Sequence, residues 1–227
     1  NQVKCWMDNL EVDSVIYQPA VNKSWHPLYG ERSTVREAYN EATMYLSKKD
    51  GSNYRLNIEV RAYDEGIAFR YFFPEHPQAI FHKVVGDLTE YTFSPGAMAW
   101  AEQWAQAPFE HLAINDIKQP VERALTVELS NGLWVALTDA DVDDWCLTKL
   151  VASPTKQNTL TSVMYSPVDI VTYYATPWKV IMAADKPGEL LEHNDIIQNL
   201  NPPCEITDTD WIRPGKIMRE TTITTEG

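Results

Sequence analysis

Hydrophobic and polar residues alternate most clearly across residues 56–73. Every second residue is apolar in 56–63 and again in 67–73, and Asp64-Glu65-Gly66 separates the two runs. A period of two is typical of a strand with one buried face. Gly66 can adopt the left-handed conformation that a three-residue hairpin loop needs. The pattern predicts a β-hairpin, and because a lone hairpin is unstable in water, other strands must cover its apolar face.

The remaining pattern is mainly that of further strands. Residues 33–47 are predicted as a second hairpin that leads through a turn at 48–51 into the central one. Residues 94–111 are interrupted by proline and glycine and are predicted as an irregular loop that faces a ligand. A short helix is predicted at 185–192, with Asp185 as its cap. Further strands are predicted at 12–17, 79–85, 88–93, 124–129, 133–137, 162–165, 170–174 and 178–183.

This balance of elements predicts an all-β fold. Strands outnumber helices, so the expected architecture is a two-layer antiparallel sandwich with few short helices. A chain of 227 residues is long enough for one substantial core, and no segment shows a second core of its own.

Charge and cysteine content narrow the possible partners. The net charge is −13 and no basic run is present, which argues against nucleic acid and anionic membrane as partners. No apolar run reaches the length of a membrane span, and no signal-peptide pattern occurs. Cys5, Cys146 and Cys204 have neither zinc-site spacing nor a disulfide framework. One bridge remains open, and buried free thiols are the favoured interpretation.

An acidic segment follows the predicted strand at 133–137. Several carboxylates at a strand end suit a hard cation such as calcium, which takes six to eight oxygen ligands. Asp139, Asp141 and Asp143 match the start of an EF-hand loop. The match then fails, because Asp144 stands where the loop needs glycine and Leu150 where it needs glutamate. A solvated acidic loop is the alternative.

Aromatic residues in the segment 94–111 are the second candidate site. Trp100 and Trp104 would share a face if this segment coiled into a helical turn, and they could stack on a sugar or pack against another domain. Glu110 and His111 could hold a sugar hydroxyl or move a proton, the alternative being a structural hydrogen bond. The other histidines are scattered and match no metal or nucleophile pattern.

Several segments together, in the same order, resemble the amino-terminal domain of glycoside hydrolase family 97, whose members are bacterial α-glucosidases and α-galactosidases. The resemblance spans nearly the whole chain. The segments are Trp25-His-Pro-Leu-Tyr-Gly-Glu31, Tyr39-Asn-Glu41, the hairpin 61–71, Thr176-Pro-Trp-Lys-Val-Ile-Met182, Asn199-Leu-Asn-Pro-Pro-Cys204 and Asp210-Trp-Ile-Arg-Pro-Gly-Lys216.

The resemblance implies a domain and its partners. Residues 1–216 are expected to form a β-supersandwich akin to galactose mutarotase, lacking its first strands. Residues 217–227 are expected to lead into an absent (β/α)8 barrel that carries the catalytic carboxylates. The chain alone is then non-catalytic. Its partners are that barrel, in the same polypeptide, and an α-linked oligosaccharide. The expected location is periplasmic or secreted.

The resemblance also bears on the candidate residues. The family places a His-Glu-Ala type of segment at Thr138-Asp139-Ala140, and the glutamate of that segment reaches a calcium ion in the barrel. Asp139 is one methylene shorter than glutamate. The resemblance therefore implies that Asp139 is the metal ligand. Calcium is expected to bind the complete enzyme, and to bind this chain alone weakly or not at all. Phe109-Glu110 resembles a Tyr-Glu pair near the active site, so Glu110 joins Trp100 and Trp104 as a substrate-binding residue.

Two other functions fit the same sequence. One is a free-standing carbohydrate-binding or scaffold module with no barrel partner. The other is a sugar epimerase of the mutarotase type, which needs a histidine-rich acid/base site. The scattered histidines do not supply that site.

Overall fold

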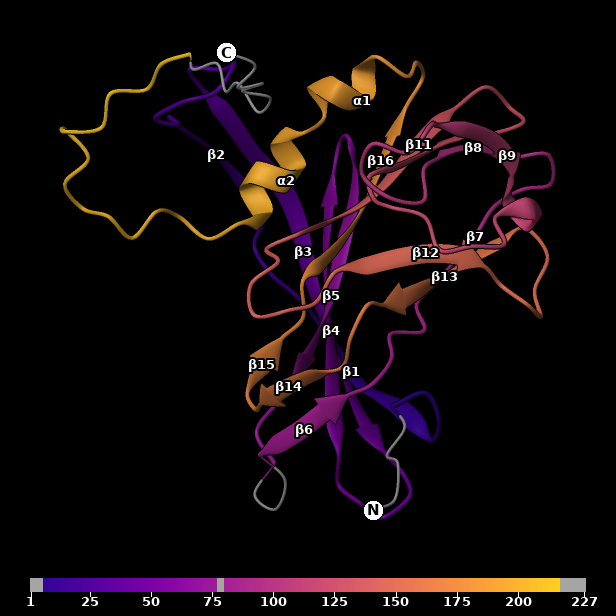
Figure 1. Cartoon of the computed structure of the whole chain (residues 1–227). Helices are drawn as coiled ribbons and strands as arrows, with labels where there is room; N and C mark the ends of the chain where they lie inside the picture. The colour runs from indigo at the N-terminus through magenta and orange to yellow at the C-terminus, as the bar shows by residue number, and fades with distance from the viewer. Residues whose placement is uncertain (1–5, 77–79, 217–227) are drawn as a thin grey trace, which may run out of the picture.

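The computed structural model describes residues 6–76 and 80–216, whose strands form one large antiparallel sheet and two small ones (Figure 1). The large sheet consists, in spatial order, of β1 (Leu10–Tyr17), β3 (Val35–Lys48), β4 (Arg55–Tyr63), β5 (Gly66–Phe73), β16 (Trp178–Ala184), β11 (Trp134–Ala140), β10 (Leu125–Glu128), β8 (Met98–Ala101) and β9 (Glu110–Ala113). In addition, β2 (Val21–Trp25) pairs with β3, and β15 (Tyr174–Ala175) pairs with β5.

The small sheets and two helices cover this large sheet. The three-stranded sheet contains β12 (Thr148–Ala152), β13 (Thr159–Met164) and β7 (Glu90–Thr92), and the two-stranded sheet contains β14 (Val168–Val171) and β6 (Phe81–Val84). The short helices are α1 (Glu189–Glu192) and α2 (Asp195–Leu200), and a 3-10 turn, η1, spans Ile114–Asp116. None of the helices in the described part of the chain has the length and apolar character that crossing a membrane requires.

Side-chain alternation in β11 shows which layer covers which face. Val135 and Leu137 pack into a cluster with Leu150 and Leu160 of the three-stranded sheet. Ala136 and Ala140, on the opposite face, pack into a cluster with residues of α1 and α2. The large sheet is therefore a middle layer here, between a small sheet and the helices, and the prediction of an all-β sandwich is confirmed.

A separate apolar cluster lies beneath the two-stranded sheet. There, Leu56 of β4 and Phe73 of β5 pack against Val168 and Ile170 of β14. The end of the central hairpin that contains Leu56 and Phe73 is therefore buried, whereas Ile67 at the turn end is 43% exposed.

The hairpin itself is confirmed, but its turn is shorter than predicted. Tyr63 pairs with Gly66, so the loop contains only Asp64 and Glu65, and Gly66 is the first residue of β5. A Cβ atom at Gly66 would lie 2.2 Å from the carbonyl oxygen of Ile181 in β16. Glycine is needed here because the backbone of β16 approaches so closely.

The prediction of a second hairpin at 33–47 is wrong. These residues form most of β3, a single strand of 14 residues. Its outer edge is shared by two partners, because β2 pairs with the first part of β3 and β1 with the second part. Between them, the amide of Gln18 donates to the carbonyl of Glu41 at 2.9 Å. No glycine or proline interrupts residues 33–47, so the strand continues where a turn was expected.

Two further local predictions need correction. The segment 94–111 is not an irregular loop, since it contains the paired strands β8 and β9, joined by a turn. Asp185 does not cap a helix, because its backbone N–H donates to the side chain of Glu189 and α1 begins only at Glu189. Strand β12 and helix α2 were not predicted at all. Residues 217–227, predicted as a linker or first barrel strand, lie outside the described residues, as does Cys5.

Candidate functional site

A buried ion pair lies between β11 and the three-stranded sheet, at the position where a metal residue was predicted. Asp139 of β11 accepts a short hydrogen bond from Arg123 on one carboxylate oxygen. Its other oxygen accepts one from the hydroxyl of Thr148 at 2.6 Å. Arg123 also donates to the hydroxyl of Ser162 at 3.1 Å. The side chains of Arg123 and Asp139 are only 6% and 14% exposed.

A second buried ion pair lies on the neighbouring strand. Lys179 of β16 pairs across the sheet with Asp139, but its ammonium group contacts the carboxylate of Asp87. The backbone N–H and hydroxyl of Thr89 donate to the other oxygen of Asp87 at 3.0 and 2.7 Å. Burial by itself would raise the pKa of Asp87, but the charge of Lys179 and these hydrogen bonds outweigh it and hold the pKa below its usual value. Two pairs of opposite charge therefore join the large sheet to the layer above it.

This arrangement bears directly on calcium. A calcium ligand needs a carboxylate oxygen free to coordinate, and several more oxygens around the ion. Both oxygens of Asp139 already accept hydrogen bonds, one of them from a buried guanidinium. Within 6–76 and 80–216, no three acidic, histidine or cysteine side chains are grouped so as to hold a metal ion. The surroundings of Asp139 do not fit a calcium ligand in this chain, and its metal role stays a prediction.

A calcium titration tests this fit. We expect 5 mM calcium to leave the thermal midpoint of the chain unchanged, because binding would have to break the contact between Arg123 and Asp139. We expect Asp139→Asn to lower the free energy of unfolding by about 1–3 kcal/mol through loss of a charge-assisted hydrogen bond. A midpoint that rises with calcium in the wild type and not in Asp139→Asn would establish Asp139 as a ligand.

The predicted substrate-binding residues lie on the hairpin of β8 and β9. Trp100 is in β8 opposite His111 of β9, and the two rings stack at 4.4 Å between centroids. Trp104 lies in the turn after β8, and the side chains of Trp100 and Trp104 are 42% and 57% exposed. Glu110 is exposed at the start of β9. The segment does not coil into a helical turn that would align the two tryptophans, and the sugar-binding role of all three residues stays a prediction.

The segments that carry the family resemblance contact one another. Arg61 donates to Glu41 at 2.7 Å, and its guanidinium lies 4.8 Å from the ring centre of the buried Trp178. The indole N–H of Trp25 donates to Asn199 at 2.8 Å. Residues from distant segments thus meet on the face of the large sheet that packs against α2. Their contacts give these motifs a structural role in joining β2, β3, β4 and α2 to the sheet.

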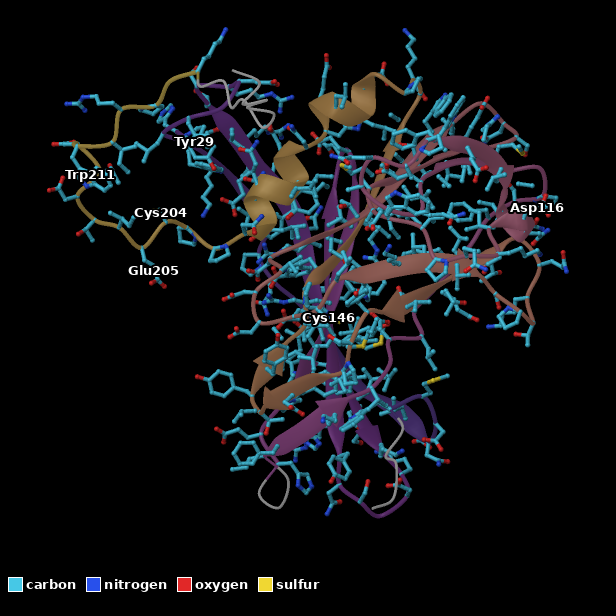
Figure 2. All side chains as sticks on the ribbon, in the orientation of Figure 1. Tyr29, Asp116, Cys146, Cys204, Glu205 and Trp211 are labelled. Atoms are coloured by element: carbon cyan, nitrogen blue, oxygen red, sulfur yellow. The ribbon has the colours of Figure 1, made fainter. Side chains whose placement is uncertain are left out.

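The structure also contains a groove that no sequence pattern indicated. It is an open groove of about 630 Å³, lined among others by Trp145, Tyr174 and Asp169. Cys146 also lines it, between the two small sheets (Figure 2). Cys146 is half-buried and Cys204 is exposed, and both are free thiols, so the expectation of burial is wrong for Cys204.

Residues 2–203 match the family model described as Glycosyl-hydrolase 97 N-terminal. The chain belongs to this family. It is 24% identical to a retaining alpha-galactosidase of Bacteroides thetaiotaomicron, over 93% of this chain and 36% of that protein. It is 23% identical to a probable retaining alpha-galactosidase of Streptomyces bingchenggensis, over 83% of this chain and 31% of that protein. The chain thus spans about a third of the length of the curated relatives it matches.

Solved structures of the family have the same fold. A glycoside hydrolase family 97 enzyme from Pseudoalteromonas sp. strain K8, in complex with acarbose, superposes with a TM-score of 0.84 and 24% identity. The match covers 91% of this family 97 N-terminal domain and 32% of that enzyme. A beta-arabinopyranosidase structure matches with a TM-score of 0.69 and 18% identity, over 78% of this chain.

Proposed function

We propose that this chain is the non-catalytic N-terminal domain of a family 97 α-glycosidase, whose barrel follows in the same polypeptide. The observation that carries the proposal is the family match over residues 2–203 in a chain that spans about a third of its α-galactosidase relatives. Because both curated relatives are named as retaining α-galactosidases, we favour α-galactosides over α-glucosides and retention of configuration. By the same resemblance, the enzyme would bind calcium in its barrel and act in the periplasm or outside the cell.

An extended arm supports the packing role of the domain. After α2 the chain runs from Asn201 to Lys216 without a strand or helix, and almost all of these residues are exposed. The arm includes Ile206 and Trp211, which are 53% and 69% exposed. Figure 2 shows Cys204, Glu205 and Trp211 on this arm, apart from the body of the domain. Large apolar side chains in such a position are typical of a surface that another domain covers. In the complete protein, we expect the barrel to pack against the arm.

An activity assay tests the proposed function. We expect the 227-residue chain to hydrolyse neither nitrophenyl α-galactoside nor nitrophenyl α-glucoside, with or without calcium, because the catalytic carboxylates belong to the barrel. A longer polypeptide that contains this sequence and a following barrel should hydrolyse at least one of them. Turnover by the chain alone, well above a heat-killed control, would contradict the proposal, and so would an inactive longer polypeptide.

A further inference from the structure

The open groove of about 630 Å³ lies where the segment 144–146 diverges from β14 and the residues before it. The two segments are still joined at one end, where the amide of Tyr165 donates to the carbonyl of Leu147 at 2.8 Å. Cavities of about 300–1,000 Å³ are the usual size for small-molecule sites. The groove is therefore large enough for a ligand of two or three sugar rings.

An aromatic pair supplies the apolar part of the groove. The rings of Trp145 and Tyr174 stack with their centroids 5.9 Å apart and their planes 21° apart. The hydroxyl of Tyr174 donates to the carbonyls of Asp143 and Asp144 at 3.1 and 3.2 Å. Burial, with the negative charge of Asp144 and its neighbours, raises the pKa of Tyr174 to about 12, so the hydroxyl remains a donor at neutral pH. The pair is thus held in place before any ligand arrives.

Polar groups in the groove are mainly acceptors. Asp144 and Asp169 each bring a carboxylate, and ionised carboxylates only accept hydrogen bonds. Among the described residues that line the groove, none is a lysine, an arginine or a histidine. Lys83 of β6 lies 3.8 Å from the carboxylate of Asp169, and both side chains are largely exposed. A matching ligand must bring hydrogen-bond donors and an apolar face, and it must not be an anion.

We propose that this groove binds a short, neutral α-linked oligosaccharide. A pyranose ring has hydroxyl donors around its rim and a face of C–H groups, which match the carboxylates and the pair of Trp145 and Tyr174. The choice of an α-linked sugar rests on the proposed function. The groove would give the enzyme a substrate-holding surface on this domain, formed entirely by residues of this chain.

Calorimetry with defined sugars tests the groove. We expect maltotriose or raffinose to bind the 227-residue chain with a Kd on the order of 1 mM. Trp145→Ala should weaken binding by about tenfold or more, because it removes the stacking ring. Asp144→Asn, which changes only an exposed acceptor, should weaken it by about threefold. The matched control is Trp211→Ala on the arm, which removes an exposed indole elsewhere and should leave the Kd unchanged. Circular dichroism checks that each variant is folded. If Trp145→Ala does not fold, the affinity of Asp144→Asn for the sugars tests the proposal instead.

Two results would contradict sugar binding in the groove. One is the absence of a binding heat with both sugars, and the other is equal affinity of Trp145→Ala, Asp144→Asn and Trp211→Ala for the sugars. Binding of tetramethylammonium in place of the sugars would make the groove a cation site. The proposed function is judged separately, by hydrolysis in the longer polypeptide. If the longer polypeptide hydrolyses its substrate but the 227-residue chain binds no sugar, only the groove proposal is refuted. If the chain binds sugar but the longer polypeptide is inactive, only the proposed function is refuted.

Discussion

Gly66→Ala is expected to lower the free energy of unfolding by about 3 kcal/mol or more. The new Cβ would lie 2.2 Å from the carbonyl oxygen of Ile181 and 2.9 Å from the Cα atom of Met182. Both are backbone atoms of β16, near the middle of the large sheet, where they cannot move without disturbing the pairing with β5 and β11. A φ of +159° at Gly66 adds strain for any residue with a Cβ. Urea unfolding followed by circular dichroism measures the loss.

Gly86→Ala is the matched control. Gly86 lies between β6 and β7, and a Cβ there would have no heavy atom within 4 Å. We expect this variant to stay within about 0.5 kcal/mol of the wild type. Equal unfolding midpoints for the two variants would show that the close approach of β16 does not constrain Gly66.

Lys179→Met is expected to destabilise the protein by about 3–5 kcal/mol at neutral pH. The side chains of Lys179 and Asp87 are only 4% and 8% exposed, so the substitution leaves a buried carboxylate without its cation. Adding Asp87→Asn should restore a large part of the loss, because no uncompensated charge then remains. Denaturant unfolding of the two single variants and the double variant gives the coupling between the residues. A double variant as unstable as Lys179→Met would disprove the account.

Acid should reduce the contribution of this pair. The pKa of Asp87 is lower in the folded protein than in the unfolded chain, so its stabilising effect is complete above the unfolded value, about 3.9, and is lost as the pH falls through the folded value. In Lys179→Met the buried carboxylate can accept a proton instead. The difference in stability between wild type and Lys179→Met should therefore shrink as the pH is lowered from 7 to 3. A difference that is constant over this range would contradict the assignment.

Side-chain alternation was the part of the sequence that predicted structure best. It located the central hairpin and the strands β10, β11 and β16, because each has a buried face and a polar face or a full apolar run. It failed for β8, where alanine supplies the buried positions and proline and glycine nearby imitate a loop. It also failed for β3, because a strand with two successive partners has no sequence feature that marks the change.

The contacts at the candidate site could not be predicted because they join residues that are distant in the sequence. Asp139 was recognised as a carboxylate at a strand end, but Arg123 and Thr148, which contact it, could be identified only from the fold. The same holds for the groove, since Trp145 and Tyr174 are 29 positions apart in the sequence. A pattern confined to neighbouring residues cannot report such contacts. The family resemblance was more informative, because it rests on several segments in order.

The separate apolar clusters beneath the two small sheets have a consequence for local opening of the molecule. Among the described residues, the cluster under the two-stranded sheet contains four buried side chains, and that under the three-stranded sheet contains thirteen. A region with fewer buried apolar contacts opens at a lower free energy than the whole molecule. Amide hydrogens of β6 and β14 should therefore exchange with solvent faster than those of β12 and β13. A ligand in the neighbouring groove would slow exchange in β14 first.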